Sequence, residues 1–546
     1  MQRTLTRAIP LLTLALALPS TVAHAGDFVD TRINFTVTDE NMLVGPGETN
    51  PSIPGLRIDK PNFFGVLFFD NYDTRYTGYE NLTHLVTYKK MTGYHWEGEA
   101  ALVLRLLEFT DVSLATLDDG SYVKVTYFID PTKERKDNIS LTAFPMSSDR
   151  MRLGYSYRLS WGGSPIFFKY DPDIPTTAQV PVNPNPAPGA RLQYANDKGV
   201  VWLGFKTSQL LNSNPSVNEL TAIYGFLGGA MLDVVKDRFR LEVNGGYFDR
   251  GTNPLFYSSQ NVNPTNPMYK DFPVWTAGVS FQASVFKGLN PQGSLDYNLY
   301  RNDPTSATRY FPKYDYKPGF NWLAQSEFTI IGTNLQDPLK TGTSVVQQAL
   351  AGDVNLRAQS GHMRLKADIS YRSLEFTLLN QPSLVPFQGY PDKSTIEGDL
   401  FASVGVDYQW ERQSFIVGVT LGIDRPANYT PPNGSVPMPG QGLCQSTGDG
   451  GPQCTNSTIV VYGAGNYSIL PAGQTAVPIY AAKVQMREDF LDFFAAILDV
   501  YTQFDQNQTH LVKQPDPTNP AGFIEKRAFV SQSAQLGFNL TLQARF

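Results

Sequence analysis

The chain ends in SAQLGFNLTLQARF, residues 533–546, and this stretch decides the fold. Every second residue from Ala534 to Phe546 is apolar, and the residues between them are polar or glycine. A period of two is that of a β-strand with one face against an apolar medium. The run is longer than most strands of globular proteins and continues to the last residue. It therefore predicts a long strand with one apolar and one polar face.

The same alternation recurs along the chain, in residues 150–161, 238–247, 362–372 and 399–410. One face of each segment is apolar and often ends in an aromatic residue, while the other is polar and charged. In lipid, strands survive only as a closed barrel, because every backbone polar group needs a partner within the protein. A secreted β-sandwich would also alternate. The aromatic ends and the terminal phenylalanine favour a transmembrane barrel.

The first residues have the features of an export signal. MQRTLTRAIPLLTLALALPSTVAHA, residues 1–25, places Arg3 and Arg7 before an apolar core and ends in Ala23-His24-Ala25, as signal peptidase requires. We therefore expect the mature chain to begin at Gly26. Beyond it the sequence has no run of about 18 apolar residues, which a spanning helix would need.

In combination, these features resemble the porin-like barrels of the Gram-negative outer membrane. The last strand is similar to the signal that the barrel assembly machinery recognises, carried here by Phe538, Leu540, Leu542 and Phe546. The resemblance implies an all-β fold, a single transmembrane antiparallel β-barrel of roughly 16–18 strands with long extracellular loops and short periplasmic turns. It also implies outer-membrane lipid and lipopolysaccharide as surroundings. No family-specific constriction motif is present, so no functional residue is transferred.

The predicted organisation is a signal peptide at 1–25, an amino-terminal segment at 26–60 and the barrel at 61–546. The amino-terminal segment is either the first strand or an element folded into the lumen or the periplasm. Long Pro/Asn/Gly-rich loops are expected at 251–272, 302–319, 380–397, 426–455 and 505–526. Turns are expected at 287–292, 411–412 and 487–489. Two stretches are ambiguous: 334–353, where Ser344 to Leu350 could form a short helix, and 488–504, for which we prefer a strand.

Few residues suggest chemistry. Cys444 and Cys454 lie in one Gly/Pro-rich loop, and in an oxidising periplasm a disulfide is the natural interpretation. A metal site would need more ligands than the neighbouring sequence supplies. The five histidines have no visible partners of a catalytic triad. We therefore expect no enzyme activity, no metal and no cofactor.

The charged face of the strands is the most informative feature. By parity it should point into the lumen and carry the candidate pore-lining residues Arg152, Arg158, Arg238, Arg240, Glu242, Arg364, Lys366, Asp368, Asp399 and Asp407. Asp296, Glu327, Lys483 and Arg487 follow the same parity. Such a wall would orient polar solutes and set ion preference. Alternatively, the charges pair across strands and stabilise a plugged barrel.

The first hypothesis is accordingly an outer-membrane channel for passive or substrate-selective passage of small hydrophilic solutes or anions. The alternatives are an exporter of surface polysaccharide and a plugged barrel with a structural, adhesion or motility role. The net charge of −6 gives no support to nucleic-acid binding. Whether the barrel forms a homo-oligomer stays open, with trimeric porins as the analogy.

Overall fold

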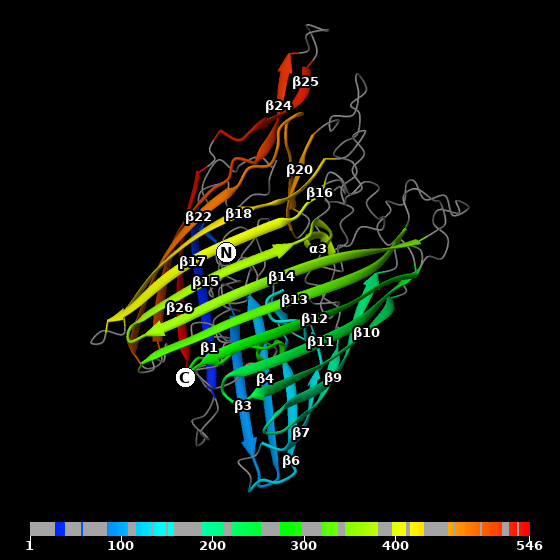
Figure 1. Ribbon diagram of the computed structural model, residues 1–546, viewed down its shortest axis with the longest axis vertical. Coiled ribbons are helices and arrows are strands. Elements are labelled where there is room, and N and C mark those ends of the chain that lie inside the picture. Colours follow the sequence, from blue (N-terminus) through cyan, green and yellow to red (C-terminus); the bar gives the residue numbers. More distant parts are fainter. Residues whose placement is uncertain are drawn as a thin grey trace, which may run out of the picture.

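The computed structural model describes residues 28–38, 56–57, 84–106, 116–118, 120–132, 136–148, 151–157, 188–211, 220–252, 273–297, 319–336, 344–379, 396–410, 415–430, 457–463, 466–491, 494–515, 523–531 and 534–545. Within these residues, eighteen long strands form one antiparallel barrel (Figure 1). In chain order they are β1 (Phe28–Thr38), β3 (His84–Thr92), β4 (Trp96–Leu106), β6 (Tyr122–Phe128), β7 (Asn138–Phe144), β8 (Gly189–Ala195), β9 (Gly199–Leu211), β10 (Leu220–Val235), β11 (Phe239–Thr252), β12 (Pro273–Lys287), β13 (Phe320–Gln336), β14 (Ser344–Ser360), β15 (Met363–Arg372), β17 (Asp399–Trp410), β18 (Phe415–Arg425), β22 (Ile479–Leu491), β23 (Phe494–Phe504) and β26 (Ala534–Arg545).

The barrel closes between its first and last strands. β1 pairs with β3 on one side and with β26 on the other, and the β1–β26 register runs from Asp30 opposite Arg545 to Thr38 opposite Gly537. Closure leaves no strand edge unpaired, which is what a sheet in lipid requires. The predicted fold class is therefore confirmed, and eighteen lies within the expected range of strands.

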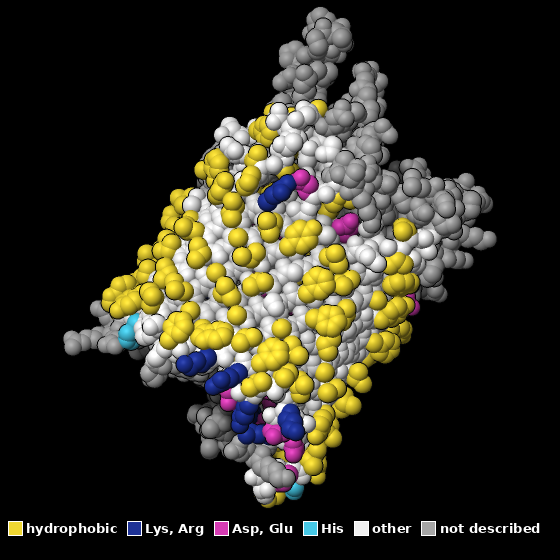
Figure 2. All heavy atoms as spheres, in the orientation of Figure 1, with side chains coloured by type: hydrophobic (Ala, Val, Ile, Leu, Met, Phe, Trp, Pro, Cys, Tyr) yellow, Lys and Arg dark blue, Asp and Glu magenta, His cyan; other side chains and the backbone are white. Residues whose placement is uncertain are grey.

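The two faces of the strands differ as the alternation predicts. On β17, Leu400, Val404 and Val406 point outward and are exposed, whereas Asp399 and Asp407 point inward and are buried. The same holds on β26, where Phe538 and Leu540 are exposed and Asn539 and Thr541 are buried. Figure 2 shows apolar side chains spread over the broad face of the barrel, with charged ones gathered near its lower edge. The apolar outer surface matches a lipid environment, and the chain is an integral barrel of the outer-membrane type.

One end of the barrel has short turns, and we call it the turn end. It includes the connections 93–95, 196–198, 236–238 and 361–362. Aromatic rings cluster there: Tyr408 lies 5.0 Å from Trp410, and Trp410 lies 5.6 Å from Phe415, between ring centroids. Phe490 and Phe494 form a similar pair at 5.9 Å. Aromatic rings at this level form the girdle expected where a barrel meets the membrane interface.

The opposite end, which we call the loop end, has small elements of its own. A four-stranded sheet consists of β16 (Ile396–Glu397), β19 (Ala427–Tyr429), β20 (Ile459–Gly463) and β21 (Asn466–Ile469). β24 (Thr509–Pro515) and β25 (Phe523–Phe529) form a separate hairpin. A short helix, α3 (Leu374–Leu379), follows β15. β2 (Leu56–Arg57) pairs with β1, and β5 (Thr116–Asp118) pairs with β4.

Several predicted elements differ from the structure. Residues 151–157 form no strand and lie inside the barrel, packed between several lumenal walls, so their alternation reflects contacts within the lumen. Ser344 to Leu350 is not helical but begins β14, because β13 extends far enough to pair with it. No strand follows β12 within residues 288–297, which fold inward. Residues 487–489 form no turn, since β22 continues to Leu491.

Other expectations have different outcomes. Of the two placements left open for 26–60, residues 28–38 adopt the first barrel strand. Residues 494–504 form strand β23, as preferred. The signal segment 1–25, both cysteines, Arg158 and Phe546 lie outside the described residues. Among the described residues, the helices are too short or too polar to span a membrane.

Candidate functional site: the barrel interior

Two connections enter the lumen, one from each end. The first follows β7 at the loop end, and we call residues 145–148 and 151–157 the loop-end insert. Its backbone is held by Glu327 on β13: the carboxylate accepts hydrogen bonds from the N–H of Tyr155 at 2.9 Å and of Ser156 at 2.8 Å. The Ser156 hydroxyl donates to Asp353 on β14 at 2.9 Å. Two buried wall carboxylates therefore fix this insert.

The backbone at Gly154 makes this docking possible. Its φ of 71° lies in the left-handed region, which side chains with a Cβ adopt only with strain. A Cβ at this position would also clash with Oε1 of Glu327. The turn aims two successive N–H groups at one carboxylate, an arrangement that binds anions well.

Apolar contacts hold the start of the same insert. Met151 is fully buried against lumenal side chains of β3, β4, β6, β7 and β23, among them Val86, Tyr122 and Phe144. The Lys206 ammonium on β9 donates to the Met151 carbonyl at 2.7 Å. The loop-end insert is thus attached to opposite sides of the wall.

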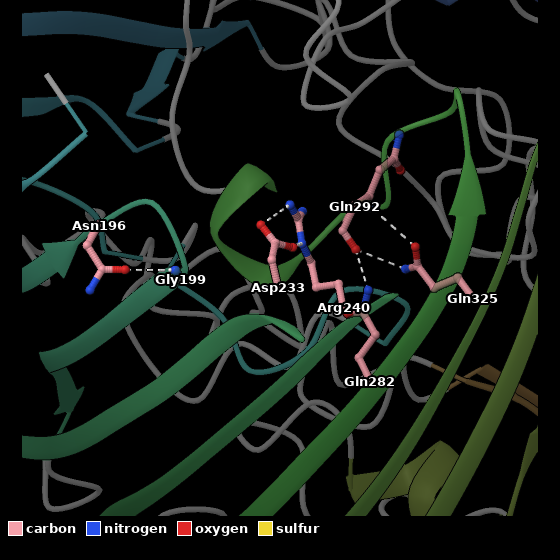
Figure 3. Close-up of polar contacts among 7 residues, drawn as sticks. All are labelled: Asn196, Gly199, Asp233, Arg240, Gln282, Gln292 and Gln325. Atoms are coloured by element: carbon pink, nitrogen blue, oxygen red, sulfur yellow. Dashed lines mark hydrogen bonds and ion pairs between the residues drawn. The ribbon is translucent and has the colours of Figure 1, made fainter. Parts of the chain in front are cut away.

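The second connection follows β12 at the turn end, and we call residues 288–297 the turn-end insert. It contains the single-turn 3-10 helix Ser294–Tyr297. Ser294 donates to Glu242 on β11 through both its N–H, at 3.0 Å, and its hydroxyl. Figure 3 shows Gln292 between Gln282 of β12 and Gln325 of β13; both glutamine amides donate to the Gln292 carbonyl.

The two inserts meet inside the barrel. The Tyr155 hydroxyl donates to Oε1 of Gln292. Around this contact, Leu153 and Tyr157 of the loop-end insert and Leu295 of the turn-end insert share one apolar cluster. Phe376 of α3 belongs to the same cluster, with its ring 5.1 Å from that of Tyr157. Apolar packing thus fills part of the lumen beside β9 to β14.

A charged wall lies on β15 and β17. Arg364 makes a bidentate ion pair with Asp407, with both N–O distances at 2.7 Å. Lys366 approaches the same carboxylate at 3.6 Å. The Lys366 side chain packs over Gly405: a Cβ added at this glycine would lie 2.8 Å from the lysine Cε. The Asp407 carboxylate thus contacts two basic side chains, and both Arg364 and Lys366 are half-buried.

Other wall charges form ion pairs across strands. Arg372 contacts Asp399 at 3.0 Å, and Lys124 contacts Glu99 at 2.9 Å. Near the turn end, Arg240 contacts Asp233 at 2.6 Å, the pair drawn in Figure 3.

The candidate pore-lining residues have different positions in the structure. Arg240, Glu242, Arg364, Lys366, Asp368, Asp399 and Asp407 all lie on the inward face of barrel strands. Arg152 lies in the loop-end insert instead of on a strand. Arg238 is exposed in the β10–β11 turn, because β11 begins one residue later. Lys483 and Arg487 are buried on the inward face of β22.

Sequence reasoning missed the residues that narrow the lumen: Tyr155, Ser156, Gln292 and Ser294. Their signal was weak. Gly154 interrupts the alternation of residues 150–161, but barrel strands also contain glycines. The pattern therefore did not distinguish a strand from an insert. The unusually long stretch between β12 and β13 was divided into a turn, a strand and a loop.

Among the described residues, no group of three or more His, Cys, Asp or Glu side chains is arranged to hold a metal ion. No protein-family model matches the chain, and no curated protein matches it. Solved barrels of Pseudomonas aeruginosa are similar along nearly the whole length. OpdL covers 95% of this chain and 98% of its own at 8% identity and a TM-score of 0.41, and OccK3 (OpdO) covers 95% of both at 7% and 0.40. The structure of OpdK with vanillate covers 95% and 98% at 7% identity and a TM-score of 0.38.

Proposed function

We propose that this protein is an outer-membrane channel that passes small hydrophilic solutes through a charged lumen. The observation that carries this proposal is an inward wall of half-buried basic groups, Arg364 and Lys366, inside a closed barrel of eighteen strands. Barrels of 16–18 strands normally enclose an aqueous channel. Basic groups in such a low-dielectric lumen concentrate anions, so anionic solutes would be favoured.

The test is single-channel conductance of the refolded mature protein in a planar bilayer, with ion selectivity taken from the reversal potential. We expect open steps with a preference for chloride over potassium. Lys366→Gln should reduce that preference, because it removes one lumenal positive charge. Lys89→Gln is the matched control. Lys89 is exposed on the outer face of β3 and does not point into the lumen. A folded barrel that stays silent at every voltage, both as wild type and as Tyr155→Phe, would contradict the proposal.

A plugged barrel with a structural or adhesive role is the second candidate. The apolar cluster of Leu153, Tyr157 and Leu295 favours it, because such packing excludes water from that part of the lumen. The same recording separates the two functions, as a permanently plugged barrel conducts in neither direction.

A further inference from the structure

We infer that the turn-end insert, residues 288–297, is the movable half of a two-part gate that closes against the fixed loop-end insert. This inference rests on the proposed channel function and adds to it the element that opens the path. Four observations carry it: an unusual connection, an unequal attachment, a hinge and a hydrogen bond across the gate.

The turn-end insert is an exception at its end of the barrel. Connections there are mostly short, as at 196–198, 236–238 and 361–362, but the one between β12 and β13 runs from 288 to 319. A hairpin needs only two to five residues to join neighbouring strands. The first ten residues of this long connection do not extend away from the barrel; they return into the lumen between Gln282 and Gln325.

The two inserts are attached unequally. The loop-end insert has Met151 in one apolar cluster, Leu153 and Tyr157 in another, and hydrogen bonds to Glu327, Asp353 and Lys206 on separate strands. The turn-end insert contributes one side chain, Leu295, to these apolar clusters, and it hydrogen-bonds polar side chains of β11, β12 and β13. Water can replace such polar contacts, whereas it cannot replace buried apolar packing. The turn-end insert is therefore the half that can leave.

A hinge is present where the insert begins. Gly288, directly after β12, has a φ of 78°, so the chain reverses there without a Cβ. Rotation about this point would withdraw residues 289–297 toward the turn end while β12 and β13 stay paired up to Lys287, and it would strain the bridge that Gly288 makes with Trp322. The loop-end insert would stay in place.

The gate has a specific contact across it, the hydrogen bond from Tyr155 to Gln292. In the closed arrangement this bond joins a segment that entered from one end of the barrel to a segment that entered from the other. Opening breaks this bond together with the bonds of Ser294 to Glu242 and of Gln292 to Gln282 and Gln325, and it removes Leu295 from the apolar cluster.

The first test locks the gate covalently. Tyr155→Cys and Gln292→Cys are introduced together after both native cysteines have been replaced by serine. The two thiols are joined by a reducible bis-thiosulfonate cross-linker, which spans the space that the two long side chains fill, and conductance is recorded before and after a reductant. We expect the cross-linked protein to be closed and the reduced protein to show open steps. Equal conductance in both states would overturn the gate, provided that mass spectrometry shows the cross-link.

The second test removes only the contact. Tyr155→Phe keeps the ring and deletes the hydroxyl that reaches Gln292, so the open-to-closed ratio should rise about tenfold, the factor for ~1.4 kcal/mol. Tyr157→Phe is the matched control: it deletes a hydroxyl of the same insert that donates to the Tyr371 carbonyl at 3.3 Å instead. An equal ratio in the two variants would overturn the assignment of this contact.

The two proposals fail differently. If the wild type conducts but neither the cross-link nor Tyr155→Phe alters gating, the gate is refuted and the channel stands. If the wild type is silent and Tyr155→Phe conducts, both stand. If the wild type, Tyr155→Phe and the reduced cysteine variant are all folded and silent, the channel function itself is refuted, and the gate with it.

Discussion

Position 154 requires glycine for two reasons. Its backbone is left-handed, and a Cβ would occupy the space of the Glu327 carboxylate. Gly154→Ala should therefore loosen the loop-end insert, because the new Cβ adds a clash to a strain of about 1–2 kcal/mol. Gly361→Ala is the matched control, since its φ is also positive, at 55°, but no atom lies within 4 Å of the added Cβ. Hydrogen exchange of the Tyr155 and Ser156 amides should accelerate in Gly154→Ala and stay unchanged in Gly361→Ala. Unchanged exchange in both variants would show that the docking does not depend on Gly154.

Glu397 should make the stability of the small loop-end sheet depend on pH. A hydrogen bond from Asn428, together with the Arg425 guanidinium, lowers the pKa of this carboxyl below its ordinary value. Because the folded-state pKa is lower than the unfolded one, the resulting stability is present above the unfolded pKa and is lost as pH falls through the folded pKa. Amide exchange in β16 and β19 should therefore quicken on acidification below pH of about 4. Glu397→Gln should flatten this dependence, and the effect should be modest because the carboxylate is about half exposed to solvent.

Single elements show what a periodic pattern can and cannot predict. β11, β15 and β17 were predicted because one face of each meets lipid and the other the lumen, which gives a clean period of two. β14 was partly misassigned, since Val345, Val346, Ala349 and Leu350 recur at helical spacing. Its pairing with β13 decides the conformation, and that partner is not visible in the local sequence.

The lipid-facing side of β17 provides a test at this scale. Val404 lies in the middle of the strand and is exposed on the outer face, so Val404→Arg should destabilise the barrel by about 2–4 kcal/mol. Tyr408 points the same way but lies near the turn end, where the same change should cost about 0–1 kcal/mol. Urea unfolding in liposomes measures both. Equal costs would mean that the two positions lie at the same membrane depth.

At the scale of the whole molecule, the barrel was predictable and its contents were not. Alternation reports on the contrast between lipid and lumen, which acts along the entire chain. The inserts depend instead on contacts between distant positions, such as Tyr155 with Glu327 and Ser294 with Glu242. Inward residues could be named from parity, as for Glu242 and Asp407, but the partner of each could not.

The docking of the loop-end insert also constrains the order in which the molecule assembles. Its carboxylate partners on β13 and β14 lie 172 and 197 residues further along the chain, so the insert has no site until those strands are in place. Contacts this distant in sequence form late, because the loop-closure entropy must be met before they stabilise anything. The lumen should therefore fill after the wall has formed, and protection of the Tyr155 amide should lag behind that of the β3–β4 hairpin in pulse-labelled refolding. Until that step the nascent barrel is wider inside than the finished one.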